Sequence, residues 1–174
     1  PADHRLASHH LEPIFAEREG WRRIYPDLPG MGQTPGADWI NCQDDILEIV
    51  LEFLDRIVPG ERVALGGVSY GGYLALAVAR HRAAKLAGLM LWTPLIHAFT
   101  PESRLPAFQV LVDDPHVVAE VGPDEQLWLR MAVVRSPETL RAFRESVKPG
   151  IMAADHAFLA RIEQRFALSV DPVP

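Results

Sequence analysis

Ser69 stands at the centre of the pattern Gly67-Val68-Ser69-Tyr70-Gly71, and a further glycine follows at position 72. The apolar run 62–68 before this pattern predicts a strand, and the nearly uniform apolar run 71–80 after it predicts a buried helix. A serine at such a strand-to-helix turn is held with its hydroxyl clear of its own backbone. We therefore expect a strained backbone at Ser69, with strand and helix so close that only glycine fits at positions 67 and 71.

This turn is the nucleophile elbow that a serine nucleophile requires. The backbone N–H of Tyr70 is expected to face the oxyanion that forms when Ser69 attacks a carbonyl, and the N-terminus of the helix adds a favourable dipole there. The structural alternative is a glycine-rich nucleotide-binding turn. However, no two of the glycines at 66, 67, 71 and 72 are separated by a single residue, and no Gly-Lys-Ser/Thr phosphate loop occurs. Ser69 is thus the candidate nucleophile, and the Tyr70 N–H is a candidate oxyanion-hole donor.

Further apolar runs extend this pattern along the first half of the chain. Residues 21–25 and 86–92 predict strands, and apolar positions at three- and four-residue spacing over 42–57 predict an amphipathic helix. A short helix is expected at 11–18. Apolar strands separated by helices are typical of parallel strands covered on both faces. The sequence therefore predicts an α/β fold with a parallel sheet.

The second half differs, because short helical segments with prolines between them replace the strand-like runs after Pro94. Ser136 followed by Pro137 predicts the start of a helix that reaches about residue 147, and a second helix is expected at about 152–166. We interpret residues 1–94 as the N-terminal part of an α/β core and residues 95–168 as a helical lid inserted after the strand that follows the nucleophile helix. Residues 169–174 would begin the return to the core.

The run 62–92, together with Asp27-Leu-Pro-Gly-Met-Gly32 upstream, resembles the α/β-hydrolase superfamily, in the lidded serine-hydrolase branch of proline iminopeptidases, carboxylesterases and C–C hydrolases. The resemblance covers residues 10–94 well and the lid only loosely. It implies a Ser–Asp/Glu–His triad in that chain order and no cofactor. It also implies an oxyanion strand ahead of residue 1, and a catalytic acid and histidine beyond residue 174, so the chain resembles a family member truncated at both ends.

Other polar residues are weighed against structural roles. Asp155 and His156 follow Ser69 in the right order, but neighbours on a helix diverge by about 100°, so that the acid cannot orient the histidine. Asp27 before a Pro-Gly turn is expected to accept backbone hydrogen bonds and shape its loop. His9 and His10 are expected to be solvated residues before a helix, and His97 and His116 to be surface or pocket-lining residues. Helix starts explain the acidic pairs Asp44-Asp45 and Asp113-Asp114. No metal-ligand spacing appears, and no metal is expected.

Composition limits the partners. The net charge of −6 gives no bulk attraction to nucleic acid or to anionic membranes. Cys42 is the one cysteine, which fits a reducing cytoplasm, and its place near a helix start without a histidine nearby disfavours a catalytic role. Neither a signal peptide nor an apolar run of transmembrane length is visible. We expect a cytoplasmic protein with a small-molecule partner and possible homo-oligomerisation.

Together these features predict a serine hydrolase that cleaves an ester, amide or related carbonyl compound through an acyl-enzyme on Ser69. Aromatic and apolar residues around the lid suggest a small, partly apolar substrate, although plain core packing is the more common use of such residues. The candidate pocket residues are Trp92, Phe99, Phe108, Leu111, Trp128 and Met131. The alternative function is a non-catalytic α/β-hydrolase-like binding or interaction protein.

Overall fold

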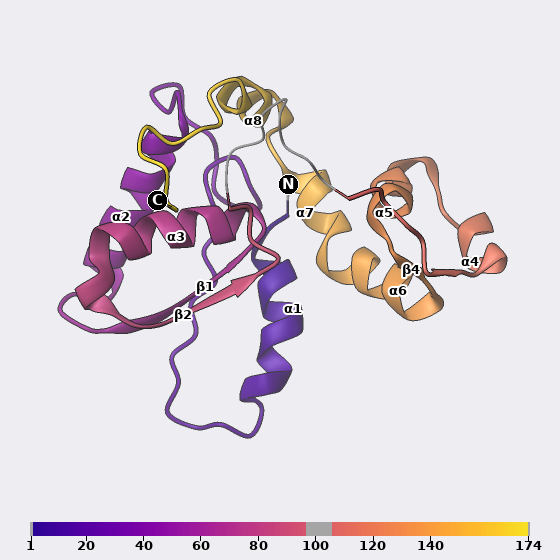
Figure 1. The fold of residues 1–174 in the computed structure, drawn as a ribbon, viewed down its shortest axis with the longest axis horizontal. Coiled ribbons are helices and arrows are strands. Elements are labelled where there is room, and N and C mark those ends of the chain that lie inside the picture. Colours follow the sequence, from indigo (N-terminus) through magenta and orange to yellow (C-terminus); the bar gives the residue numbers. More distant parts are fainter. Residues whose placement is uncertain (1, 97–105, 174) are drawn as a thin grey trace. The chain divides into compact units, whose positions relative to one another are not determined.

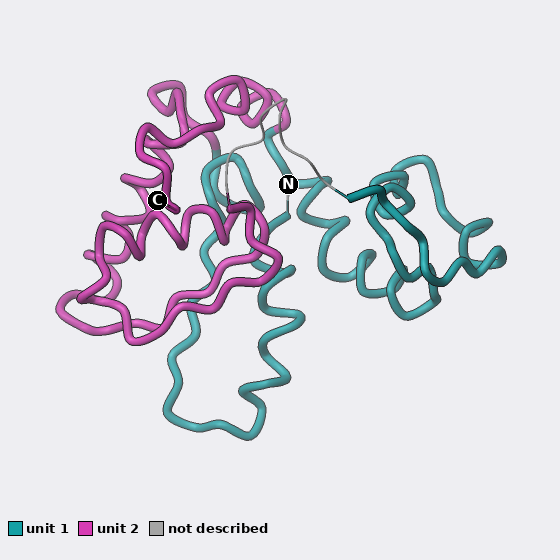
Figure 2. Tube along the Cα trace, viewed as in Figure 1, with its two compact units in different colours: residues 1–35, 104–155 teal, residues 36–103, 156–174 magenta. Residues whose placement is uncertain are grey.

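The computed structural model describes residues 2–96 and 106–173. They form two compact units, shown in Figure 2: unit 1 comprises residues 1–35 and 104–155, and unit 2 comprises residues 36–103 and 156–174. The division into an α/β core at 1–94, a helical lid at 95–168 and a return to the core at 169–174 stays a prediction.

Unit 2 holds the parallel sheet. Its elements in chain order are α2 (Gln43–Ile57), β1 (Val63–Val68), α3 (Tyr70–Arg82), the 3₁₀ turn η1 (Ala83–Lys85), β2 (Leu86–Trp92) and α8 (His156–Glu163) (Figure 1). Strands β1 and β2 pair in parallel, with Val68 opposite Trp92. The expected order of strand, helix and strand is confirmed, and so is the α/β fold with a parallel sheet.

Helix α3 covers the sheet in this unit, because its apolar residues contact both strands, and α2 packs against α3 (Figure 1). The buried apolar residues of the two helices are Ile46, Leu47, Tyr73, Leu74, Ala75, Ala77 and Val78. By contrast, Leu89, Met90 and Leu91 of β2 remain 37–45% exposed. The expectation that both strand faces are covered is therefore wrong for the described residues of this unit, since a face is buried only where an element packs on it.

Unit 1 is mainly helical. It contains α1 (His4–Phe15), β3 (Val112–Asp113), α4 (Pro115–Ala119), the 3₁₀ turn η2 (Pro123–Glu125), α5 (Gln126–Met131), β4 (Val134–Arg135), α6 (Pro137–Ser146) and α7 (Lys148–Ala153). Its apolar core is formed by Val117, Trp128, Leu140 and Phe143. Helix α1 packs against α6. None of the helices formed by residues 2–96 and 106–173 is long and apolar enough to cross a membrane.

Several element boundaries differ from those expected. Helix α1 begins at His4 rather than near residue 11, because the Asp3 carboxylate caps it by accepting the Arg5 N–H at 3.0 Å. The segment 21–25 forms no ladder with the described residues, and an extended segment without a paired neighbour is no strand. The helix expected at 152–166 is divided between α7 and α8, since Ala154 turns to an extended conformation with ψ 143°. The start of α6 after Ser136 is confirmed, with the Ser136 hydroxyl accepting from the Thr139 N–H.

Candidate active site around Ser69

The backbone at Ser69 makes the turn from β1 into α3. Ser69 has φ 50° and ψ −116°, outside the regions that non-glycine residues favour, and it is the N-cap of α3. The expected strained backbone at this residue is confirmed. Such a conformation costs about 1–3 kcal/mol and persists only where the surroundings hold it in place.

Four backbone hydrogen bonds hold Ser69. Its N–H donates to the Trp92 carbonyl at 3.0 Å, so that the turn continues the pairing of β1 with β2. Its carbonyl accepts the N–H groups of Gly72 at 2.9 Å and Tyr73 at 3.2 Å, and also the N–H of Leu95 at 3.1 Å. The turn is thus fixed both by the helix that it starts and by the chain that follows the neighbouring strand.

Three glycines next to Ser69 differ in how much space surrounds them. A Cβ on Gly67 would collide with the backbone at Gly71, and a Cβ on Gly72 would lie 2.7 Å from the Pro94 side chain. Among the described residues, a Cβ on Gly71 would meet nothing within 4 Å. The expectation that only glycine fits at 67 and 71 is therefore correct at Gly67 and wrong at Gly71, because the close approach at the start of α3 falls on Gly72.

Tyr70 opens helix α3, so its backbone N–H has no acceptor within the helix. Its side chain is turned inward: the phenol donates a hydrogen bond to Oε1 of Gln43, the first residue of α2. Burial, with a further contribution from Tyr73 nearby, raises the pKa of the Tyr70 phenol well above its usual range. The group is therefore a neutral donor. Sequence reasoning missed Gln43, because nothing in the pattern of α2 distinguishes its first polar residue.

No described side chain hydrogen-bonds the Ser69 hydroxyl, and Ser69 itself is exposed. His81 lies in the last turn of α3, about 16 Å from the start of the helix at Tyr70 at the helical rise of 1.5 Å per residue. Asp155 lies between α7 and α8 and His156 is the first residue of α8, so they are not neighbours within one helix as expected. His97 and Phe99 lie outside the described residues.

The other candidates from the sequence take structural positions. His9 and His10 lie within α1 with their rings 5.0 Å apart, so the expectation that they precede a helix is wrong, because α1 already begins at His4; His116 is in α4. Asp44 and Asp45 lie in the first turn of α2, as expected, and Cys42 is its N-cap. Asp114 caps α4, whereas Asp113 lies in β3 and pairs with Arg135.

The candidate pocket residues separate into two groups. Trp128 is core, with 4% of its surface exposed. Leu111, Met131 and Phe108 are 72%, 67% and 53% exposed, and Trp92 is half-buried at the end of β2. Core packing is therefore the role of Trp128, whereas the three exposed side chains are not part of a core.

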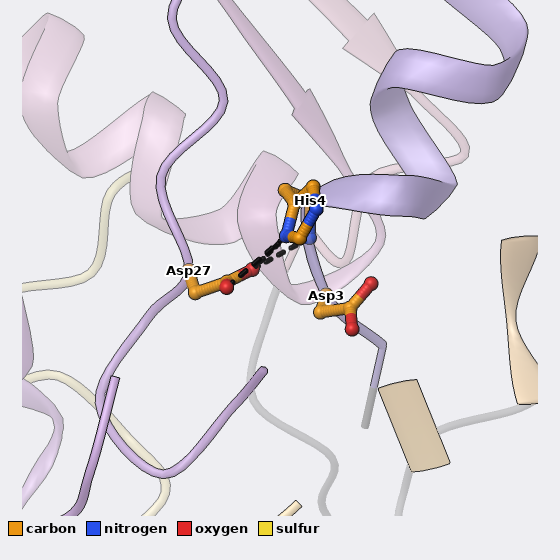
Figure 3. A group of neighbouring side chains, drawn as sticks. All are labelled: Asp3, His4 and Asp27. Carbon is orange, nitrogen blue, oxygen red and sulfur yellow. Dashed lines mark hydrogen bonds and ion pairs between the residues drawn. The ribbon is translucent and has the colours of Figure 1, made fainter. Parts of the chain in front are cut away.

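Asp3, His4 and Asp27 bring one possible metal ligand each to within 4.8 Å of one another (Figure 3). Their oxygens are already occupied: Asp3 caps α1 and pairs with Arg5, while Asp27 accepts from His4 and from the Gln33 N–H. A cation would have to displace these donors at a helix N-terminus, where the dipole opposes positive charge. The three residues therefore fit a capping and loop-holding role rather than a metal site. The expected loop-shaping role of Asp27 is confirmed.

A hollow on unit 1 is lined mainly by Glu120, Glu125, Arg144 and Lys148. Glu125 is 2% exposed and accepts from Arg144 Nε at 2.7 Å, Lys148 Nζ at 2.9 Å and the Gly122 N–H at 3.1 Å. Arg144 is the main cause that holds the pKa of the Glu125 carboxyl far below its usual range, against the effect of burial. The carboxylate of Glu125 is thus paired with the cations of Arg144 and Lys148, so the cluster is a structural ion-pair network.

Comparison with known proteins identifies a family and two solved structures of similar fold. A model of the alpha/beta hydrolase family matches residues 3–173. An alpha/beta superfamily hydrolase from Oenococcus oeni superposes with a TM-score of 0.83 at 24% identity, covering 97% of this chain and 62% of the other. A thermophilic esterase from Thermogutta terrifontis, solved with malate bound, gives a TM-score of 0.53 at 22% identity over 94% and 62% of the two chains. At these identities the structures show a shared fold. The chain spans less than two thirds of either structure, and no curated protein matches it in sequence.

Proposed function

Because the chain belongs to the alpha/beta hydrolase family, we propose that it carries the nucleophile of a serine hydrolase acting on an ester, amide or related carbonyl compound. The observation that carries this proposal is the backbone of Ser69, whose φ of 50° places an exposed serine at the junction of the partly buried strand β1 and the buried first turns of α3. The strained conformation of Ser69 costs free energy, and a turn with a purely structural role does not need such strain.

In the proposed reaction the Ser69 Oγ attacks the carbonyl carbon of the substrate and gives its proton to a histidine base. The Tyr70 N–H donates to the oxyanion of the tetrahedral intermediate, since this N–H has no acceptor within α3. As the intermediate collapses, the protonated base returns its proton to the leaving oxygen or nitrogen, the alcohol or amine departs, and an acyl group stays on Ser69 Oγ. Water then attacks the acyl-enzyme with the same base, and the acid product leaves.

The base and its orienting acid are proposed to come from sequence other than residues 1–174. Two observations support this: no described side chain bonds the Ser69 hydroxyl, and the chain covers 62% of each similar structure. We further propose that residues 95–168 act as a lid, that the substrate is small and partly apolar, and that the protein is cytoplasmic. Homo-oligomerisation is compatible with the exposed apolar residues of β2.

The test is covalent labelling of the full-length protein with a fluorophosphonate probe, followed by mass spectrometry to locate the adduct. The expected result is one adduct on Ser69, which disappears in Ser69→Ala. The matched control is Ser8→Ala, because Ser8 lies in α1 and its hydroxyl donates a hydrogen bond to the Arg5 carbonyl. Folded protein that takes up no probe at Ser69 overturns the proposal and favours a non-catalytic binding protein of the same fold.

A further inference from the structure

Gln43 and Tyr70 form a hydrogen bond between the first residues of two helices. Gln43 begins α2 and Tyr70 begins α3, and the phenol of Tyr70 donates to the Gln43 side-chain carbonyl. Gln43 is 2% exposed, which makes it one of the most deeply buried polar side chains of the described residues. A buried amide is tolerated where its polar atoms are satisfied, and Tyr70 supplies the donor for its oxygen.

The ring of Tyr70 is held as firmly as its hydroxyl. Phe166 lies against it with 5.7 Å between ring centroids. Tyr73 stacks on Phe166 with their ring centroids 6.0 Å apart, so the three rings form a small aromatic cluster. Tyr73 in turn accepts the Leu168 N–H on its hydroxyl at 3.1 Å. The Tyr70 side chain is therefore restrained at its ring by packing and at its tip by Gln43.

This restraint acts on the peptide bond between Ser69 and Tyr70. The Ser69 carbonyl belongs to that peptide and accepts three backbone hydrogen bonds, which fix the peptide on the Ser69 side. On the other side the peptide is bonded to the Cα of Tyr70, whose position depends on helix α3 and on the side chain that Gln43 and Phe166 hold. The direction of the Tyr70 N–H follows from these two anchors, since a rigid peptide plane with both ends fixed cannot rotate.

Resting on the serine-hydrolase function proposed above, we propose that Gln43 is a positioning residue: by binding the Tyr70 hydroxyl it aims the Tyr70 N–H at the oxyanion. Gln43 acts through Tyr70 and does not touch the substrate. An oxyanion donor stabilises the transition state only when it already points at the developing charge, so a small loss of alignment lowers kcat rather than substrate binding.

The experiment measures hydrolysis of p-nitrophenyl butyrate and the rate of fluorophosphonate labelling by full-length protein carrying Gln43→Leu, Tyr70→Phe or both. Each single variant should lower kcat about ten-fold with KM changed less than about two-fold, because only transition-state contact is lost. Labelling should slow by a similar factor, since the phosphonyl oxygen uses the same donor. The double variant should be no slower than either single one, as expected of two residues that act through one hydrogen bond.

Tyr73→Phe is the matched control, because it removes a phenol from the same aromatic cluster without touching Gln43. It should lower thermal stability as the other variants do and leave kcat unchanged. Folded Tyr70→Phe with wild-type kcat and labelling rate overturns the positioning role, and so does an equal loss of kcat in Tyr73→Phe. Tyr70→Phe keeps the ring and its packing, so the test stands even where Gln43→Leu fails to fold. Wild-type protein that is neither labelled nor active instead overturns the serine-hydrolase proposal itself.

Discussion

His4 and Asp27 are joined by two hydrogen bonds to one carboxylate oxygen. The backbone N–H of His4 donates to Asp27 Oδ1 at 2.7 Å, and the imidazole Nδ1 lies 3.0 Å from the same atom (Figure 3). The other oxygen accepts the Gln33 N–H at 2.9 Å. One carboxylate therefore ties the start of α1 to both ends of the loop at 27–33, which explains why an acid precedes this turn.

Asp27→Asn is expected to lower the free energy of unfolding at pH 7 by about 1–3 kcal/mol, the usual size of hydrogen bonds to a buried charged group. Burial opposes ionisation of Asp27, but the N–H groups of Gln33 and His4 and the His4 ring outweigh it and hold the pKa of this carboxyl below 3.8. Because the folded pKa lies below the unfolded one, the carboxylate contributes fully above the unfolded pKa. This contribution is lost as the pH falls through the folded pKa.

Urea unfolding at a series of pH values checks this. The gap between wild type and Asp27→Asn should be constant near neutrality and narrow below about pH 4. Asp38→Asn, at an exposed acid of unit 2, is the control and should follow wild type throughout. A gap that stays constant down to pH 2 would contradict the role assigned to the carboxylate.

Gly32→Ala should destabilise the protein by about 3 kcal/mol or more, because strain and a collision act together. Gly32 has φ +52°, and an added Cβ would collide with the carboxylate of Asp27. Gly20 has φ +81°, and no described residue lies within 4 Å of an added Cβ, so Gly20→Ala carries the backbone strain alone, about 1–2 kcal/mol. Chemical denaturation of both variants measures the difference. Equal losses would mean that contact with Asp27 adds nothing.

Gly71→Ala and Gly72→Ala should change stability in opposite directions. Both residues lie in the first turn of α3, where alanine favours the helix over glycine by about 0.5–1 kcal/mol. Gly71 has open space and should show this gain, whereas Gly72→Ala must push Pro94 away and should lose about 1–3 kcal/mol. Thermal melts of the two variants give the comparison, and a stable Gly72→Ala would contradict the close packing described around Ser69.

Glu125→Gln should lower Tm by about 5 °C, since the neutral amide weakens the buried hydrogen bonds to Arg144 and Lys148, although Lys148 keeps its ion pair with Asp124. Glu120→Gln is the control, because the Glu120 carboxylate is largely exposed and lies 3.9 Å from Arg144. It should change Tm by less than about 1 °C. Differential scanning calorimetry separates the two, and similar shifts would show that burial of Glu125 carries no extra stability.

Local sequence pattern was sufficient to predict the turn at Ser69. The glycines, the apolar run before them and the apolar run after them all lie within about twenty residues, and the backbone conformation there depends on these neighbours. The same holds for the helix start at Ser136 and for the acid at position 27, where a side chain acts on backbone a few residues away.

Only the tertiary structure decided which distant residues meet. Gln43 and Tyr70 are 27 residues apart on different helices, and no periodicity links them. Gly72 rather than Gly71 is the crowded position because Pro94, beyond the next strand, packs on it. Hydrophobic periodicity specifies which face of an element is buried, but the partner on that face follows from how the elements pack together. The sequence alone therefore determined the place and shape of the candidate nucleophile, and the packing of α2 and β2 around α3 determined what holds it there.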